Sequence, residues 1–433
     1  MENYPLPVPN TTAQAFNEYN TGHVPDNQNP GLVFERFVPD WSDHADTLKE
    51  KGLQAVLNAS EHTSQELLSA WNMRWQAFTK GALTFSLQTD WRLVAGLGKK
   101  GSLEIGFTFH RYGFPYLPGS SMKGLARASA LLQIGGKIGK PGLESLHEQV
   151  VPEREKKKIG LLGALENVLS RPEETTFQKE FTLCSPTAEI MELARTFRIV
   201  FGTTEHGGHV TFFDAIPSKD NSRLIELDIM NPHYPDYYKE TGQEEVKTPP
   251  ANWQSPIPVK FLVVAPGATF HFAVGWRSAP IDRTPLEDLP EKARSEWSWF
   301  KGATAPIADK RNPVLEQARQ WLEDGLRNLG AGGKTNAGYG YFISSGERVS
   351  KQRDAARQKS VMPVGYERGI VKDFELGDNH SYGHITRSNG EKLFVHKNNL
   401  RTGLSTLQEG QHVIFRPGVV AGKPQALDVY LEE

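Results

Sequence analysis

The chain has 433 residues, more than a single hydrophobic core usually supports, so its length predicts two or three domains. Its 49 basic and 51 acidic residues give a formal net charge of -2, which argues against a protein that binds nucleic acid through its overall charge. There is no long apolar run, no secretion signal in MENYPLPVPN and no cysteine besides Cys184. These features predict a cytoplasmic protein with no membrane association and no disulfide.

The N-terminal part is predicted to contain one clear helix and one clear strand. Residues 1–58 are rich in Pro, Asn and Asp and are predicted to be irregular. Apolar residues between Leu67 and Phe78 recur at helical spacing and predict a helix over 62–79. In SLEIGFTFHR, apolar residues from Leu103 to Phe109 alternate with small or polar ones, which predicts a strand with one apolar face.

A turn at Pro118-Gly119 is predicted to lead into another helix, which Ser120 is placed to cap. Residues 135–183 are polar and helical in places, without a strand signature, and are interpreted as an insertion. Val210, Phe212 and the alternating run ATFHFAV predict strands in the aromatic-rich middle of the chain.

The best-marked helix is predicted to begin at Asn312-Pro313 and to end at Gly330, because proline is tolerated in a first turn and glycine favours a helix end. The glycine-rich loop GAGGKTNAGYG and a short strand, YGYFI, follow. The apolar stripe of this helix consists of Leu315, Ala318, Trp321, Leu322, Leu326 and Leu329.

The C-terminal part changes character twice. Residues 346–364 are locally basic and poor in apolar side chains, which is typical of a linker. From Gly369 onward, short alternating strands with glycine-rich turns predict a separate all-β domain. The predicted division is therefore a body over 1–345, a basic linker over 346–364 and a β domain over 365–433.

The last domain resembles the cold-shock domain, a five-stranded OB-type barrel. The match rests on GIVKDF at 369–374, SYGHI at 381–385, LFVH at 393–396, EGQHVIF at 409–415 and GKPQALDV at 422–429. SYGHI and LFVH stand where the family has its two RNA-binding motifs. The resemblance implies a barrel that binds single-stranded RNA or DNA by stacking.

The residue types on these strands fit such stacking. Alternate side chains of a strand point to one face, so Tyr382 and His384 share a face. Phe394 and His396 do the same on the next strand. Nucleobases stack on such rings at roughly 1–3 kcal/mol each, with little sequence preference. The predicted RNA-binding residues of the barrel are Tyr382, His384, Phe394, His396, Phe374 and Lys372.

Two positions depart from the family pattern. Asp373 stands where the family has Trp, and His384 replaces the second aromatic residue of the first motif. Because a carboxylate repels phosphate, weaker binding than that of an isolated cold-shock protein is expected. A barrel retained as a structural or protein-docking module remains the alternative.

The body resembles the RAMP superfamily of CRISPR systems, specifically the sixth-subunit family of the type III-B Cmr effector. The match rests on PYLPGSSMKGLAR in the first half, FGTTEHGGHVTFFDAIP at 201–217, MNPHYPDYY at 230–238, WQSPIPVKFLVV at 253–264 and LGAGGKTNAGYGYF at 329–342. It implies an α+β, ferredoxin-like, RRM-related sheet with helices on one face, carrying insertions.

The same resemblance points to two RNA contacts in the body. The helix after Pro118 would offer backbone N–H groups, hydroxyls and cations to a phosphate, although plain capping would also explain the residues. The glycine-rich loop would contact the guide RNA, or would be a tight turn packed under its helix. The predicted residues are Ser120, Ser121, Lys123, Arg127, Gly332, Gly333, Lys334, Thr335 and Asn336.

Nucleotide, metal and catalytic sites are not expected. The loop runs from helix to strand, and Asn328 stands where a P-loop requires glycine. His206, His209 and His233 lack partners at metal-ligand spacing, and His110 is expected to be structural. Asp214 is expected to anchor a loop rather than to bind metal. No cofactor is predicted.

The interpretation is a non-catalytic RNA-binding and assembly subunit of a type III-B effector that supports antiviral defence. Its expected partners are guide CRISPR RNA, bound towards the 3′ end, single-stranded target RNA, and other Cmr subunits including the repeating backbone subunit. One alternative is a RAMP-type endoribonuclease that matures guide RNA. Another is a stand-alone RNA chaperone that acts through the cold-shock end alone.

Overall fold

The computed structural model describes residues 29–36, 45–61, 65–99, 105–221, 223–231, 258–277, 312–360, 365–376, 381–401, 404–420 and 422–432. The chain divides into two compact units, Met1–Arg348 and Val349–Glu433. The segment expected to be a linker forms helix α12 (Ser345–Ser360), and Arg348 near its start donates to the carbonyls of Thr89 and Asp90. The limits proposed at 345 and 365 stay a prediction.

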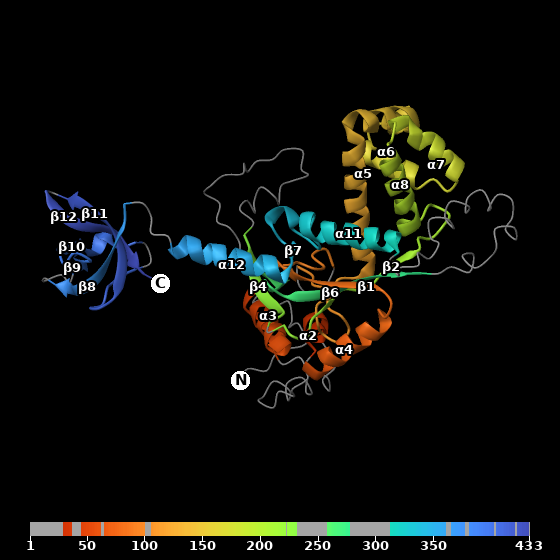
Figure 1. The fold of residues 1–433 in the computed structure, drawn as a ribbon. Coiled ribbons are helices and arrows are strands. Elements are labelled where there is room, and N and C mark those ends of the chain that lie inside the picture. The colour runs from red at the N-terminus through yellow and green to blue at the C-terminus, as the bar shows by residue number, and fades with distance from the viewer. Residues whose placement is uncertain are drawn as a thin grey trace, which may run out of the picture. The chain divides into compact units, whose positions relative to one another are not determined.

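The first unit is built on an antiparallel sheet (Figure 1). Its strands are β1 (Leu83–Thr89), β2 (Val210–Phe212), β3 (Ile216–Pro217), β6 (Thr269–Trp276) and β7 (Phe342–Ile343). The order is β2-β6-β1-β7, with β3 also paired to β6. Helices separate β1 from β2 and β6 from β7. The ferredoxin-like detail of the topology stays a prediction. The strands expected around Val210, Phe212, ATFHFAV and YGYFI are confirmed.

One face of this sheet packs against α5 (Gly119–Val150), α8 (Ala188–Phe201) and α11 (Pro313–Asn328). Phe270, Phe272 and Val274 alternate along β6 and are fully buried. They share a core with Trp321 of α11, which is also fully buried. Large aromatic and β-branched side chains thus fill the interface between this face of the sheet and the helices.

The opposite face of the sheet is covered as well, which differs from the expectation of helices on one face. Helix α4 (Gln65–Phe78) lies across it, with Leu68 and Trp75 buried beside Ala273 of β6. The Trp75 ring lies 5.9 Å from the His271 ring, and its Nε1 donates to the Asp214 carbonyl at 2.8 Å. The helix predicted over 62–79 is confirmed, but its apolar residues build a second layer.

Helix α11 follows its sequence signals closely. Asn312 caps it, because its Oδ1 accepts from the N–H groups of Val314 and Leu315. At the other end, Gly330 has φ +77° and donates to the Gly325 carbonyl, which ends the helix as expected. All of its predicted apolar stripe is buried except Leu329, which is half-buried.

Two expectations in the N-terminal part were wrong. Residues 30–36 and 45–58, which were expected to be irregular, form α2 (Pro30–Arg36) and most of α3 (Ala45–Glu61). Their buried Val33, Phe34, Leu53 and Val56 recur at helical spacing, and this local signal outweighs the polar composition. The strand expected over 102–111 is absent from its described residues 105–111, where Phe109 forms only an isolated bridge.

The segment interpreted as an insertion, residues 135–183, consists mainly of helices joined by short turns. Helix α5 is 32 residues long and bends at Gly139, beside Pro141. It is followed by α6 (Leu161–Leu169), α7 (Glu174–Phe181) and α8, which pack beside its second half. Among the described residues, no helix is long and apolar enough to cross a membrane.

A two-stranded hairpin lies beside the glycine-rich loop. Its strands are β4 (Ile225–Met230) and β5 (Val259–Val264), which pair antiparallel. Phe261 and Val263 are buried against Val94 in a small core that Met230 and Tyr339 also contact. The hairpin thus supports the segment 92–95, on which the loop rests.

The second unit is a closed five-stranded barrel, as the cold-shock resemblance implied. Its strands are β8 (Glu367–Leu376), β9 (Tyr382–Arg387), β10 (Lys392–His396), β11 (His412–Val420) and β12 (Lys423–Leu431), in the order β10-β12-β11-β8-β9. Ile385, Val395, Val413 and Phe415 fill its core. Closure leaves no free sheet edge, so the outer face is available for binding.

Candidate nucleic-acid interface

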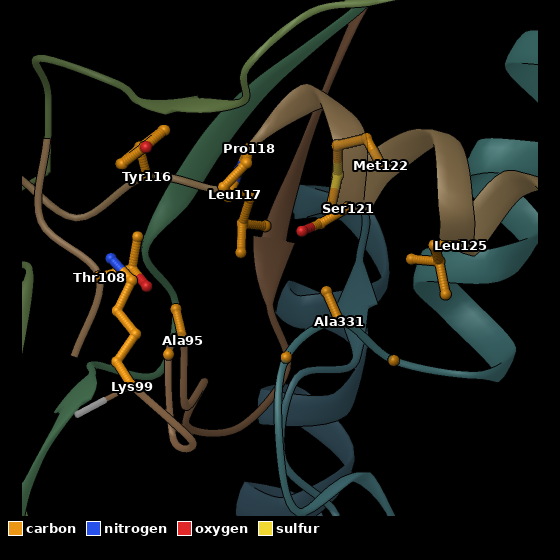
Figure 2. Close-up of a pocket in the computed structure, with 13 residues that line it drawn as sticks. Ala95, Lys99, Thr108, Tyr116, Leu117, Pro118, Ser121, Met122, Leu125 and Ala331 are labelled. Atoms are coloured by element: carbon orange, nitrogen blue, oxygen red, sulfur yellow. The ribbon is translucent and has the colours of Figure 1, made fainter. Parts of the chain in front are cut away.

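A cavity of about 490 Å³ joins the two RAMP-like motifs of the body. Figure 2 shows the first turns of α5 on one side of the cavity and the segment around Ala331 of the glycine-rich loop on the other. Motifs that are about 210 residues apart in the sequence therefore share one site. The lining residues are Ala95, Gly96, Lys99, Thr108, Tyr116, Leu117, Pro118, Ser121, Met122, Leu125, Gly330, Ala331 and Gly332.

The start of α5 is not capped by Ser120, and that expectation was wrong. Pro118 occupies the N-cap, and Asp214 Oδ1 accepts from the Gly119 N–H at 2.6 Å. Asp214 thus anchors the loop after β2 to this helix, as expected. Its carboxylate takes the place at the positive helix end that a phosphate would otherwise occupy. Ser120 and Ser121 are exposed in the first turn, and of these two Ser121 lines the cavity.

The two cations of this motif have different surroundings. Arg127 donates to Glu166 at 2.9 Å and to Ser170 at 3.0 Å, and its guanidinium lies over the Phe197 ring. It therefore ties α5 to α6 and α8. Burial lowers the pKa of Lys123, and the positive charges of Arg127 and Arg277 lower it further. A bound anion would stabilise this group of neighbouring positive charges.

The glycines of the loop are explained first by close packing. Gly332 has φ +81°, and a Cβ there would overlap the Val94 carbonyl oxygen. Gly340 has φ +78°, and a Cβ there would overlap the Ala331 carbonyl oxygen. The loop is pinned by hydrogen bonds from Gly333 to Val94 and from Gly340 to Arg92, each 2.8 Å. This confirms that Gly332 needs a positive φ and that the loop runs from helix to strand.

The exposed side of the same loop still offers donors. Lys334 has φ +60°, which turns the chain into a short 3-10 helix at Thr335–Ala337. Within the described residues, the N–H groups of Gly332 and Lys334 donate to no protein acceptor. Thr335 and Asn336 follow on this half-exposed to exposed side. The Lys334 ammonium lies 3.1 Å from the Met230 sulfur, a weak acceptor, so it keeps capacity for a phosphate.

Two of the candidate histidines of the body, His110 and His209, lie in ring contacts. His110 stacks on Phe114 at 4.6 Å, and burial lowers its pKa. His209 is buried and stacks on Trp276 at 5.6 Å. Among the described residues, no group of three or more His, Cys, Asp or Glu is arranged for a metal ion. His233 lies outside the described residues.

Sequence reasoning missed Lys99 and Tyr116 as members of the site. Lys99 is exposed at the mouth of the cavity and Tyr116 is half-buried in its wall. Lys99 forms no ion pair with any carboxylate in the part of the chain that the structure describes. The sequence AGLGKKG around Lys99 could have indicated this site, because its glycines and lysines resemble the composition of the glycine-rich loop GAGGKTNAGYG.

On the barrel, four of the predicted rings, those of Tyr382, His384, Phe394 and His396, share one face. In the β9–β10 pairing His384 lies opposite Phe394, and Tyr382 lies opposite His396. The Tyr382 and Phe394 rings are 5.4 Å apart and nearly parallel, at 28°. Phe394 and His384 meet edge to face at 6.1 Å. A Cβ at Gly383 would overlap the Asp373 carbonyl oxygen, so glycine keeps the strands in register.

His384 and His396 each have a fixed orientation. Nδ1 of His384 lies 2.7 Å from Asp373 Oδ1. Nδ1 of His396 accepts from the Asn398 N–H at 3.1 Å, which caps a short 3-10 helix. Both side chains are half-buried, so each presents one edge of its ring to solvent.

Two further predicted residues of the barrel are placed differently. The β8–β9 register shifts between Val371 and Asp373, and this bulge turns Phe374 towards the barrel core, where it lies beside Gly383. Phe374 is therefore not part of the stacking face, because the alternation assumed from sequence is interrupted. Lys372 is exposed and lies 3.7 Å from Glu409, so its charge is partly compensated.

Both parts of the chain have matches among known proteins. The RAMP superfamily model matches residues 84–343, and the 'Cold-shock' DNA-binding domain model matches residues 367–432. CRISPR system Cmr subunit Cmr6 of Pyrococcus furiosus is 33% identical over 270 residues, which cover 60% of this chain and 68% of that protein.

Two solved structures are also similar. The crystal structure of Cmr6 from Pyrococcus furiosus is 27% identical with a TM-score of 0.32, and the match covers 61% of this chain and 97% of that one. A chain of the type III-B Cmr-beta complex bound to cognate target RNA is 19% identical with a TM-score of 0.36, covering 76% of this chain and 85% of that one. On the family match and the Cmr6 sequence identity, this chain belongs to the RAMP superfamily as a Cmr6 relative and carries a C-terminal cold-shock domain.

Proposed function

We propose that the chain is a non-catalytic RNA-binding and assembly subunit of a type III-B CRISPR effector. The observation that carries the proposal is the convergence of the start of α5 and the glycine-rich loop on one cavity. Lys99 lines this cavity, and Lys123 and Lys334 belong to the two motifs that form it. None of the three has a carboxylate partner among the described residues. Phosphate contacts of this kind position RNA without reading its sequence.

The bound RNA is the guide, held towards its 3′ end beside the repeating backbone subunit. This assignment comes from the family resemblance, since the matched relative is a Cmr subunit. The barrel would add a second contact, with an exposed single strand that stacks on Tyr382 and Phe394. Arg127 and Phe374 do not belong to these surfaces, because protein neighbours already hold them.

The structure gives less support to the endoribonuclease alternative. RNA cleavage without metal needs a base and an acid placed around one ribose. His110 lies within an aromatic cluster with Trp71 and Phe114, where burial favours its neutral form. Its ring is therefore poorly placed to exchange protons with RNA.

A charge added to the cavity tests the proposal. Ser121→Glu places a carboxylate at the cavity wall and should reduce guide-RNA retention by the assembled complex several-fold, because it repels phosphate. Ala128→Glu is the matched control, since Ala128 is exposed on the same helix outside the cavity. Equal retention by both variants would contradict the site.

Assembly is tested separately. The tagged full chain, purified from native cells, should bring down other effector subunits together with guide RNA. Recovery of the chain alone with heterogeneous RNA would favour the stand-alone chaperone instead.

A further inference from the structure

The two departures of the barrel from the cold-shock pattern lie against each other. Asp373 of β8 and His384 of β9 are cross-strand partners, and their Oδ1 and Nδ1 atoms are 2.7 Å apart. The carboxylate that replaces the family's Trp is therefore held by the imidazole that replaces an aromatic residue. These two changes form one hydrogen-bonded unit rather than two separate losses of a stacking ring.

This unit borders the stacking face. The side chains of His384 and Asp373 are 35% and 36% exposed. The bulge after Val371 is what brings Asp373 to the outer side, while Phe374 turns inward. Because the His384 ring meets Phe394 edge to face, the pair lies where the edge of a base stacked on Phe394 would be.

The Asp373–His384 pair offers hydrogen-bond acceptors rather than donors to a bound base. An ionised carboxylate only accepts, so the proton of this hydrogen bond is carried by His384 Nδ1. In the neutral imidazole, Nε2 is then an acceptor, and Asp373 keeps its second oxygen. An RNA base at this position therefore meets acceptors. Cytosine offers its N4 amino group to a carboxylate, whereas uracil presents the O4 acceptor at the same place.

We infer that the Asp373–His384 pair makes the barrel select cytosine over uracil in single-stranded RNA. Asp373 acts both directly, through its free oxygen, and as the positioning residue that fixes the His384 tautomer. The inference rests on the proposed stacking of RNA on Tyr382 and Phe394. It adds base reading to a face whose rings alone would bind all bases alike.

The test compares oligocytidine with oligouridine of equal length, since the two bases are of similar size. We expect the full chain to bind oligocytidine about fivefold more tightly. Asp373→Asn should strengthen binding of both oligomers, because a negative charge is lost, and should abolish the preference, because an amide also donates. Glu409→Gln is the matched control: it removes a surface carboxylate of the barrel beside Lys372 and should leave the preference unchanged.

Two outcomes separate this inference from the proposed function. Equal or tighter binding of oligouridine by the unaltered chain, or a preference that persists in Asp373→Asn, overturns the base-reading role. If Tyr382→Ala with Phe394→Ala leaves the affinity for both oligomers unchanged, the stacking face itself fails and the inference fails with it. A preference lost in Asp373→Asn but retained in Glu409→Gln supports the inference.

Discussion

The cavity of the body and the stacking face of the barrel offer RNA different chemistry. The cavity is lined largely by glycine, alanine and apolar side chains, together with one cation, Lys99, which has no carboxylate partner among the described residues. On the barrel, Arg368, Arg387 and Arg401 are paired with Glu432, Glu367 and Asp428, while the exposed face carries rings. The net charge of the chain therefore does not reveal its local charge pattern, because the chain as a whole is close to neutral.

The two contacts should therefore fail in different ways. A phosphate contact weakens as salt rises, because bound counterions are no longer released into dilute solution. A stacking contact depends much less on salt.

Removing the rings should have the largest effect on the barrel. Tyr382→Ala with Phe394→Ala should cost roughly 2–6 kcal/mol of RNA binding if each ring stacks one base. Tyr430→Ala is the control, since this aromatic residue lies on β12 over Arg401, outside the stacking face. Fluorescence anisotropy with short single-stranded RNA gives the affinities. An equal loss of affinity in the Tyr430→Ala control would show that the face carrying Tyr382 and Phe394 has no special role in RNA binding.

The loop should respond through its backbone. Gly340→Val should destabilise the body by at least about 1–3 kcal/mol, because the position has a positive φ and its Cβ would overlap the Ala331 carbonyl. Gly346→Ala is the control, since its Cβ would meet nothing within 4 Å. Thermal unfolding gives the melting temperature of each variant. An unchanged melting temperature for Gly340→Val would contradict the close packing of Gly340 against Ala331.

A smaller effect concerns the protonation of Lys123. Its pKa is lowered in the free protein by burial, then by Arg127 and Arg277. The folded state therefore binds this proton less tightly than the unfolded state. The resulting cost in stability is present below the folded pKa and disappears as the pH rises past the usual 10.5.

A phosphate beside Lys123 should raise its pKa, so RNA binding should take up protons and weaken as the pH rises towards 10.5. Titration calorimetry in buffers of different ionisation enthalpy measures this uptake. Lys123→Met should abolish it. Uptake that persists in Lys123→Met would assign the proton to another group.

The smallest effect is expected from Lys334→Ala. The side chain is half-buried against Met230, so the free energy of unfolding should change by no more than about 0.5 kcal/mol. RNA affinity should fall uniformly across sequences by the equivalent of about one phosphate contact. Sequence-dependent losses in a binding assay would show that Lys334 reads bases instead.

Much of the fold follows from local signals in the sequence. Asn312, Pro313 and Gly330 mark the ends of α11, and the alternation in ATFHFAV marks β6, because caps and periodicity act over a few residues. The five barrel strands were found through a resemblance that preserves their spacing. In contrast, α2 and α3 were missed, since composition was given more weight than the spacing of Val33, Phe34, Leu53 and Val56.

The site was predictable only in part, because contacts between distant segments leave little trace in a single sequence. The two motifs were recognised separately, but their shared cavity depends on the order of the strands between them. Asp214 accepts from the first N–H group of α5, a capping role that was expected of Ser120, which lies 94 residues earlier in the sequence. The bulge that turns Phe374 inward inserts one residue into a regular alternation, and the pattern itself gives no sign of it.

The most direct test of the two-contact account is the salt dependence of RNA binding by three full-length proteins. These are the unaltered chain, Lys99→Ala with Lys334→Ala, and Tyr382→Ala with Phe394→Ala. Each lost single-strand phosphate contact should reduce the slope of log affinity against log salt by about 0.7. We expect the lysine variant to lose about 1.4 from the slope, and the aromatic variant to lose affinity at every salt concentration with its slope unchanged. An unchanged slope in the lysine variant, or a reduced slope in the aromatic variant, would contradict the assignment of phosphate contacts to the body and stacking to the barrel.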